Sequence, residues 1–349
     1  GERSRFLHQM VYQGTYPVDD IPVTIPMSNY PIHPIEIVQS KETIEKLKRY
    51  TPDNNKMLSP SALNVYLDCT LKFYFRYIAQ IPEPEEISEE IDAAVFGNIL
   101  HDSMEAIYKR HESISVDRET IRRYLTDDAL IAAIVESAFE ENYSRNSSLF
   151  NNSGNNAIVK KVIQSYVRQI LKIDSTITPF DISELEEEHK MIMNVSSNPD
   201  VQEIVLGGKI DRIDKTGDTF RIIDYKTGKA EHGFGELSQL FEKEKLNRNK
   251  AVFQTFFYSY VLSHKTEKKI QPGLYPVRNI YAEDFDSRIF IKEKSRKLFV
   301  EDFSEIKQLY GRMLSGIIDE LYSPDNIYKQ TSEYHFCQYC AYCDICRRG

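Results

Sequence analysis

Two aspartates and a lysine in the middle of the chain, Asp211, Asp224 and Lys226, are residue types that can hold a divalent cation beside a fixed positive charge. The apolar segments 205–213 and 220–225 flank a polar turn and predict a β-hairpin. Residues two apart on a strand share a face, so Asp224 and Lys226 project together. A turn centred on residues 216 and 217 would place Asp211 diagonally opposite Asp224, near enough for both carboxylates to grip one ion.

Two neighbouring carboxylates repel each other and take up a proton unless a cation neutralises them. Mg²⁺ or Mn²⁺, a hard ion that prefers oxygen ligands, would resolve that conflict, and the backbone carbonyl of Tyr225 would supply a further ligand. Such an ion activates water against a phosphate ester, and Lys226 would position that water or stabilise the developing charge. The alternative is a surface hairpin with solvated Asp and Lys, because an Asp-x-Lys triplet is a weak pattern by itself.

The five cysteines are a second group of residues whose types and spacing could do chemistry. Cys69 lies early in the chain, and Cys337, Cys340, Cys343 and Cys346 lie within the last thirteen residues. In a reducing compartment, clustered cysteines indicate metal ligands before disulfides. Four thiolates in one site suit an iron–sulfur cluster or zinc.

The elements that position these residues mix helices with strands. Ser59 before Pro60 predicts the start of a helix that runs towards Cys69. The apolar spacing predicts further helices at about 93–110, 119–143, 155–174, 251–263 and 303–321, with strands from residue 187 onwards and another at 289–291. We therefore expect an α/β fold with large helical additions.

Four short motifs resemble the PD-(D/E)XK nuclease superfamily, most closely its RecB-type and AddB-type branch, and they follow one another along the chain in the order found in that branch. GGKIDRID followed by IIDYKTG is similar to the active-site hairpin. FGNILHDSME is similar to a helical motif whose histidine, here His101, completes the metal site. Gln254 and Tyr258 in QTFFYSY match a Gln-x-x-x-Tyr helix that flanks the catalytic centre, and GLYPVR matches the strand that follows. Residues 186–188 could add another acid, although a triple-Glu run is usually a solvated face.

The resemblance implies a restriction-endonuclease-like mixed sheet flanked by helices over residues 58–349, with a helical insertion at about 111–185 and a cysteine-rich tail at 335–349. The branch often closes its nuclease domain with a [4Fe–4S] cluster held by one cysteine before the core and three after it. Cys69, Cys337, Cys340 and Cys346 match that plan, which ties together the two ends of the domain. Cys343 is an addition, and with it the tail alone could form a four-cysteine site, in which case zinc is the alternative.

The resemblance also implies a place within a longer protein, a cellular role and a partner. GERSRFL is similar to the end of the helicase-like region that precedes the nuclease in AddB-like proteins, so residues 1–57 are expected to be an N-terminal extension from that region. The resemblance therefore implies a DNA nuclease that acts in double-strand-break repair, beside an AddA-like helicase/nuclease subunit. No Walker-type G-x-x-x-x-G-K-[ST] run occurs, so this chain is not the motor itself.

Composition and net charge narrow the remaining classes of function. The chain carries a formal net charge of −9, which disfavours a protein coated in nucleic acid but allows a locally basic groove. No run of eighteen apolar residues and no signal segment occurs, so we expect a cytoplasmic protein without a membrane span. The competing interpretations are a stand-alone exonuclease of the kind associated with CRISPR and a non-catalytic DNA-binding scaffold with a structural metal site.

Overall fold

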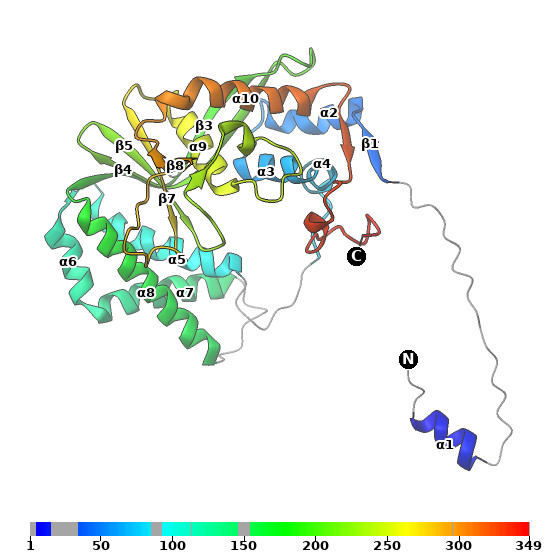
Figure 1. Ribbon diagram of the computed structural model, residues 1–349, viewed down its shortest axis with the longest axis horizontal. Coiled ribbons are helices and arrows are strands. Elements are labelled where there is room, and N and C mark those ends of the chain that lie inside the picture. Colours follow the sequence, from blue (N-terminus) through cyan, green and yellow to red (C-terminus); the bar gives the residue numbers. More distant parts are fainter. Residues whose placement is uncertain are drawn as a thin grey trace. The chain divides into compact units, whose positions relative to one another are not determined.

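The hairpin predicted from the sequence forms part of a five-stranded mixed sheet with strand order β2-β3-β4-β5-β7 (Figure 1). Strands β2 to β5 pair antiparallel, whereas β5 and β7 pair parallel. The predicted α/β class with a mixed sheet flanked by helices is confirmed. The strands are β2 (Ser115–Val116), β3 (Phe180–Asn194), β4 (Glu203–Thr216), β5 (Thr219–Lys226) and β7 (Lys269–Pro276).

This computed structural model describes residues 5–14, 34–84, 93–112, 114–145, 154–294 and 296–348. The chain divides into two compact units, residues 1–33 and 34–349. Helix α1 (Arg5–Gln13) is the described element of the first unit, and part of the GERSRFL segment falls outside the described residues. None of the described helices combines the length and apolar character needed to cross a membrane.

The second unit begins at Pro34, so it contains residues 34–57 of the expected N-terminal extension together with the domain expected from residue 58. Strand β1 (Glu36–Val38) pairs with β10 (Ile327–Lys329), close to the other end of the chain. Helix α2 (Lys41–Leu47) contributes Ile44 and Leu47 to the main core. Residues 34–57 therefore pack with the nuclease core rather than outside it.

The turn between β4 and β5 lies one residue later than expected. Thr216 pairs with Thr219, which leaves Gly217 and Asp218 as a two-residue loop, and Gly217 has φ of +59°. Glycine adopts this left-handed conformation without steric cost, so the tightest turn forms around it. The expected diagonal placement of the two aspartates was wrong: Asp211 and Asp224 each lie next to one member of the last residue pair, Arg212 and Ile223.

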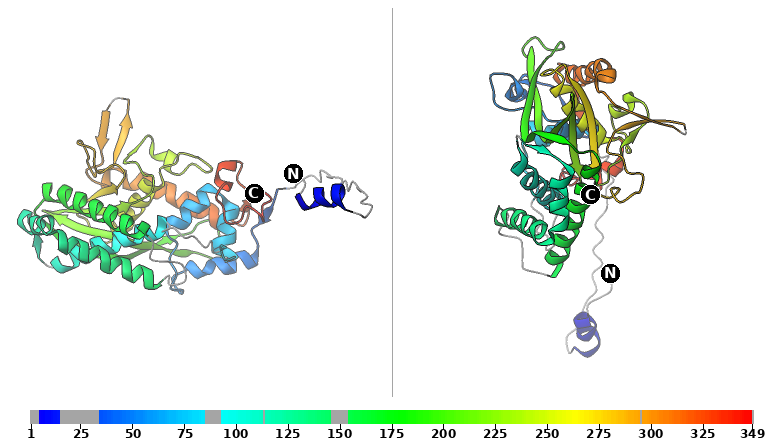
Figure 2. Two further views of the ribbon diagram at one scale, coloured as in Figure 1. Left: turned by 90° about the horizontal axis from the view of Figure 1, so that it is seen from below. Right: turned by 90° about the vertical axis from the view of Figure 1, so that its left-hand side faces the viewer.

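Helices cover both faces of the sheet (Figures 1 and 2). Ile222 of β5 faces one hydrophobic core and Ile223 faces the other, as the alternation of a strand requires. The first core is shared with α3 (Pro60–Asp68), α9 (Lys250–Leu262) and α10 (Ser304–Tyr322), and the second with α5 (Ala93–Tyr108), α6 (Arg118–Thr126), α7 (Asp128–Arg145) and α8 (Gly154–Thr176).

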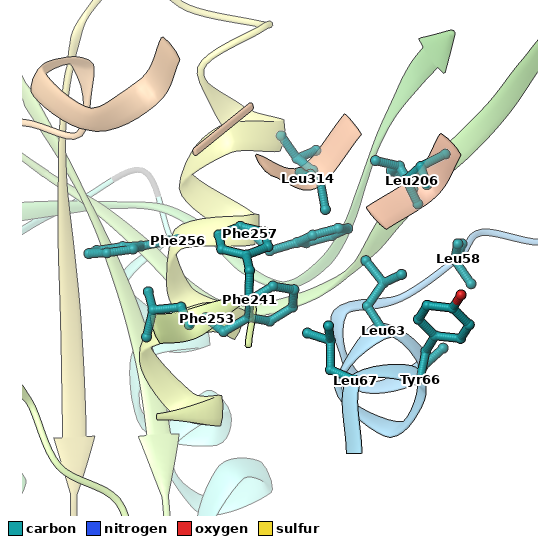
Figure 3. Packing of buried hydrophobic residues seen from close by; sticks show 14 of the residues in the cluster. Leu58, Leu63, Tyr66, Leu67, Leu206, Phe241, Phe253, Phe256, Phe257 and Leu314 are labelled. Atoms are coloured by element: carbon teal, nitrogen blue, oxygen red, sulfur yellow. The ribbon is translucent and has the colours of Figure 1, made fainter. Parts of the chain in front are cut away.

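The first core is dominated by aromatic and leucine side chains (Figure 3). Phe253, Phe256 and Phe257 of α9 project from a helix that is apolar almost all round, as a fully buried helix should be. They meet Phe241 and the leucines of α3, while Leu206 comes from β4 and Leu314 from α10. This packing holds α9, which carries Gln254 and Tyr258, against the sheet.

The expected insertion forms a helical layer between α5 and β3. The single helix expected at 119–143 is divided into α6 and α7, because Asp127 leaves the helical conformation and its carboxylate accepts a hydrogen bond from the backbone of Leu130 at 2.9 Å. That is an N-cap, which starts a new helix. Strand β3 begins at Phe180, earlier than the strand region expected from residue 187.

Candidate active site

Three ligand-type side chains, His101, Glu186 and Asp211, meet where α5 crosses β3 and β4. Nδ1 of His101 lies 3.3 Å from Oδ2 of Asp211 and 3.6 Å from Oε1 of Glu186. The ligand atoms of all three lie within 4.8 Å of one another, the one such group among the residues that the structure describes. Two carboxylates and an imidazole at this spacing can share one divalent cation.

Glu186 reaches this group through an unusual backbone conformation. It lies opposite Asp211, between the pairs Leu185–Arg212 and Glu187–Ile210, and its φ is +53°. A glutamate seldom adopts this left-handed conformation, and such strain gathers at functional sites because the surrounding structure must hold it in place. The Glu186 side chain is only 12% exposed, and Nζ of Lys209 pairs with its second oxygen at 2.8 Å. The expectation of a solvated glutamate face does not describe Glu186.

The backbone of Tyr225 connects the histidine group to the second strand of the hairpin. Its N–H donates to Oδ2 of Asp211 at 2.8 Å, and its carbonyl oxygen lies 3.1 Å from Nε2 of His101. The carbonyl therefore points into the same space as the imidazole and the carboxylate. The sequence-based proposal that this carbonyl is a ligand is compatible with its position.

Asp224 and Lys226 share a face, as the strand period requires, and form a buried pair. Nζ of Lys226 donates to Oδ1 of Asp224 at 2.8 Å and lies 2.6 Å from Oδ2. Gln254 on α9 donates to the same Oδ1 at 3.1 Å, and its amide also lies 3.4 Å from the hydroxyl of Tyr258. The buried Oδ2 accepts no hydrogen bond of good geometry from the described residues. The ion pair with Lys226 is therefore what balances the charge of this oxygen within the described part of the chain.

Burial and charge shift the protonation of these groups in opposite directions. Burial disfavours the imidazolium of His101, but Asp211 and Glu186 outweigh it and raise the pKa of His101 well above its ordinary value. Burial likewise opposes charge on Asp211, yet His101 and Lys226 hold the pKa of Asp211 below its usual range. Burial raises the pKa of Asp224 to about 6, against the opposing pull of Lys226. The group as a whole attracts positive charge, which is what a cation site requires.

Lys226 stays protonated in this setting. Burial by itself would lower its pKa, but the carboxylates of Asp224 and Asp211 outweigh that and raise the pKa of Lys226. Its side chain is 25% exposed, so the ammonium is held by Asp224 on one side and still reaches solvent. A fixed cation at the mouth of a carboxylate cluster suits the approach of an anionic group such as a phosphate.

A buried network of charges supports the hairpin from the opposite face of the sheet. Arg212 is fully buried and donates to Asp174 at 2.8 Å, to Asp214 at 2.9 Å and to the Tyr225 hydroxyl at 2.9 Å. The Tyr275 hydroxyl donates to Asp174 at 2.8 Å. Further members are Tyr108 of α5, which donates to Asp174, and Arg221, which pairs with Asp214 at 2.6 Å. The network links α5, α8, β4, β5 and β7, the same elements that carry or flank the site.

The cysteines gather at a second location. Cys69 caps the short helix α4 (Thr70–Phe73), accepting from the Lys72 backbone at 3.4 Å, and lines one pocket with the four cysteines of the tail. Burial raises the pKa of Cys69, and Cys340 adds to that shift. Burial also raises the pKa of Cys346, with contributions from Cys340 and Cys337. Cys343 takes no part in these interactions, and its Sγ lies 3.9 Å from the carboxylate of Asp344.

The structure thus brings together, around the hairpin, all the residues that the sequence singled out for the catalytic and metal site: His101, Asp211, Asp224, Tyr225, Lys226, Gln254 and Tyr258. It adds Glu186, whose run of glutamates was set aside. It also adds the support from Arg212 and Asp174. The sequence does contain a sign of this support. Arg212 lies next to Asp211 inside an apolar strand, where a charge without a partner would be costly.

Comparison with known proteins agrees with this geometry. Over 182 residues the chain is 26% identical to an ATP-dependent helicase/deoxyribonuclease subunit of Streptococcus equi subsp. zooepidemicus (strain MGCS10565). The alignment covers 51% of this chain and 15% of that much longer protein. The family model of the PD-(D/E)XK nuclease superfamily matches residues 57–347, a span that contains the hairpin, His101, Gln254 and all five cysteines. The chain therefore belongs to the PD-(D/E)XK nuclease superfamily.

Proposed function

We propose that this domain is a metal-dependent deoxyribonuclease. The observation that carries the proposal is the convergence of His101, Glu186 and Asp211 beside the Asp224–Lys226 pair, since Asp211 and Asp224 occupy opposing positions on the two strands of the hairpin. The donor set is rich in carboxylate oxygens, which fits Mg²⁺ or Mn²⁺. Membership of a nuclease superfamily supports hydrolysis of nucleic acid in general, and the name of the relative supports DNA as the substrate.

His101, Glu186, Asp211, Asp224 and the Tyr225 carbonyl would hold the ion. When bound, a divalent cation lowers the pKa of water and polarises a phosphoryl oxygen. Among the described residues, Oδ2 of Asp224 is held only by its ion pair with Lys226, and Gln254 fixes the carboxylate by holding Oδ1. Lys226, protonated throughout, donates a hydrogen bond to the phosphate or to the attacking water and stabilises the charge that grows on the phosphate oxygens.

Tyr258 has a supporting role in this scheme. Its hydroxyl lies beside the Gln254 amide, and burial raises its pKa so that it remains a neutral hydrogen-bonding group. Gln254 and Tyr258 are one helical turn apart and therefore face the hairpin together. We infer that the pair orients Asp224 rather than contacting the scissile bond.

The decisive test is cleavage of end-labelled single-stranded and double-stranded DNA with Mg²⁺ or Mn²⁺, comparing wild type with Lys226→Ala and Asp224→Ala. Metal-dependent cleavage that is lost in both variants, with the wild-type circular dichroism spectrum retained, would support the proposal. Cleavage that persists in a chelator would contradict it. DNA binding without any cleavage by anaerobically purified wild type would point to the scaffold interpretation instead.

We further propose that the domain acts in double-strand-break repair beside a helicase partner, an AddA-like subunit. The relative that supports this carries helicase and deoxyribonuclease in its name, and only a small part of its length is covered. A helicase would deliver a single strand to the site. Co-purification of the full-length protein with a helicase subunit, and stimulation of cleavage by ATP in the complex but not in the isolated domain, would test this.

The cysteines suit an iron–sulfur cluster better than a single zinc ion. Zinc draws four thiolates to about 2.3 Å and therefore holds their sulfurs about 3.8 Å apart. Among the described residues no three sulfur atoms lie within 4.8 Å of one another, although all five cysteines line one pocket. A larger group, ligated by Cys69, Cys337, Cys340 and Cys346, fits that wider spacing, and Cys343, which lines the same pocket, is not needed as a ligand.

The cluster proposal is tested by iron and acid-labile sulfide content after anaerobic purification, with the visible absorbance as a second readout. Cys69→Ser should abolish both signals, whereas Cys343→Ser should retain them. The opposite pattern would mean that the tail binds its metal without Cys69. Stoichiometric zinc and no sulfide would overturn the cluster assignment while leaving the nuclease proposal intact.

A further inference from the structure

The nuclease unit carries a small three-stranded sheet, and the hairpin within this sheet projects beyond the body of the unit in both views of Figure 2. Its order is β6-β8-β9, with β6 (Gly233–Phe234) parallel to β8 (Phe290–Glu293), and β8 antiparallel to β9 (Arg296–Phe299). Strand β6 comes seven residues after Lys226, the last residue of β5. In the connecting loop Glu231 pairs with Lys292 of β8 at 2.8 Å. The β8–β9 hairpin is therefore attached to the segment that leaves the catalytic strand.

The hairpin is strongly basic within an acidic chain. Of the five described residues between 292 and 297, four are lysine or arginine and one is glutamate, whereas the whole chain carries a net charge of −9. Lys292 and Lys297 lie directly opposite each other in the pairing. Like charges in that position destabilise a hairpin. Each is offset by an acid from outside the hairpin, Glu231 at 2.8 Å and Asp284 at 3.6 Å.

The two remaining cations, Lys294 and Arg296, are exposed at the tip. Neither forms an ion pair with any residue in the described part of the chain. Lysines on an edge strand commonly protect it from pairing with another sheet. That explanation covers β9, the edge strand, but not Lys292 of β8, which lies between β6 and β9, nor Lys294 in the turn. Arg296 lies opposite Glu293 in the pairing, which supports the hairpin, but folding does not account for the charges of Lys292 and Lys294.

We infer that the basic hairpin formed by residues 290–294 and 296–299 binds the phosphate backbone of the DNA strand next to the scissile bond, chiefly through Lys294 and Arg296. The inference rests on the proposed deoxyribonuclease function. The substrate is a polyanion whose affinity for proteins comes largely from contacts of lysine and arginine with phosphates. The hairpin offers such contacts while attached to the segment that continues from Lys226, and it does not belong to the catalytic group. It thus holds the strand in place and leaves the chemistry to the residues described above.

The test measures binding of a fluorescein-labelled single-stranded oligonucleotide by anisotropy, over a series of salt concentrations and with a chelator to prevent cleavage. Wild type is compared with the double variant Lys294→Gln/Arg296→Gln. Each lost phosphate contact should reduce the slope of log K against log salt by about 0.7, so two lost contacts reduce it by about 1.4. The rate of metal-dependent cleavage at saturating DNA should stay unchanged.

Lys268→Gln/Lys269→Gln is the matched control. It removes the same charge at the start of β7, the opposite end of that strand from the site. Its salt slope should equal that of wild type. An unchanged slope in the hairpin variant, or an equal loss in both variants, overturns the inference while DNA cleavage by wild type preserves the nuclease proposal. Failure of wild type both to bind and to cleave DNA overturns the two together.

Discussion

Removing the guanidinium of Arg212 is expected to be the most damaging single change behind the hairpin. Arg212 is fully buried and bonds to Asp174 at 2.8 Å and 3.2 Å, to Asp214 at 2.9 Å and to Tyr225 at 2.9 Å. Arg212→Met keeps most of the side-chain volume but removes every donor. Asp214 retains Arg221 at 2.6 Å, whereas Asp174 keeps only the tyrosine hydroxyls as hydrogen-bond donors among the described residues.

The magnitude follows from leaving a buried carboxylate without its cation. Removal of one partner from a buried ion pair costs about 3–5 kcal/mol. For a unit of about 300 residues, that corresponds to a fall of about 5–8 °C in the unfolding midpoint. We expect this shift at pH 7, measured by calorimetry or by circular dichroism on the same domain.

The pH dependence of the unfolding midpoint provides a second, independent test of this prediction. Burial opposes charge on Asp174, but Arg212 outweighs it and lowers the pKa of Asp174 in the native protein. A lowered folded-state pKa means that this stabilisation is present above the unfolded pKa and is lost as pH falls through the folded value. Without Arg212, burial is opposed only by the tyrosine hydroxyls and by Arg221, so the pKa of Asp174 rises and the carboxyl of the variant is neutralised at a higher pH than in wild type. The difference between wild type and variant should therefore shrink from pH 7 towards pH 4.

Arg212→Met/Asp174→Asn is the matched control, because it removes both charges of the pair. The double variant should be less damaged than the sum of the two single variants, with a coupling of more than about 1 kcal/mol. A midpoint shift of less than 1 °C, or a shift of equal size at pH 7 and pH 4, would refute the assignment of a tightly coupled buried pair.

Three further predictions concern the site and its support. Glu186→Gln should raise the Mn²⁺ concentration needed for half-maximal cleavage by about tenfold or more, while the unfolding midpoint without metal stays near that of wild type; an unchanged metal requirement would exclude Glu186 from the ion site. Gly208→Ala places a Cβ 3.2 Å from Cε1 of Tyr258 and 3.4 Å from its hydroxyl. The rate of cleavage should therefore fall, because the Gln254–Tyr258 pair shifts, and the free energy of unfolding should decrease by about 1–3 kcal/mol. Gly97→Ala is its control, because the new Cβ meets only the Thr227 hydroxyl at 3.2 Å, and activity equal to wild type in both variants would dismiss the proposed role of Tyr258. Phe253→Ala opens a cavity in the aromatic core at a fully buried position and should cost about 3–5 kcal/mol in denaturant unfolding, whereas a cost below 1 kcal/mol would show that the core closes around the gap.

The local sequence pattern determined the elements that carry the candidate site. Two apolar segments on either side of a polar turn indicated the strands of the hairpin, and the strand period alone placed Asp224 and Lys226 on a common face. Ser59 before Pro60 marked the start of α3, where the Ser59 hydroxyl does accept from the backbone of Ala62. These features depend on neighbours within a few residues, so they can be read without knowing the fold.

Only the tertiary structure decided which distant groups complete the site. Glu186 looked like part of a solvated run until the left-handed turn of its backbone directed its carboxylate at His101. The two-residue turn at Gly217 set the register that brings Asp211 and Asp224 to adjacent strand positions. Arg212 is tolerated in the interior because Asp174, on a helix of the insertion, supplies the opposite charge. In each case the deciding contact joins separate elements whose distance only packing can set.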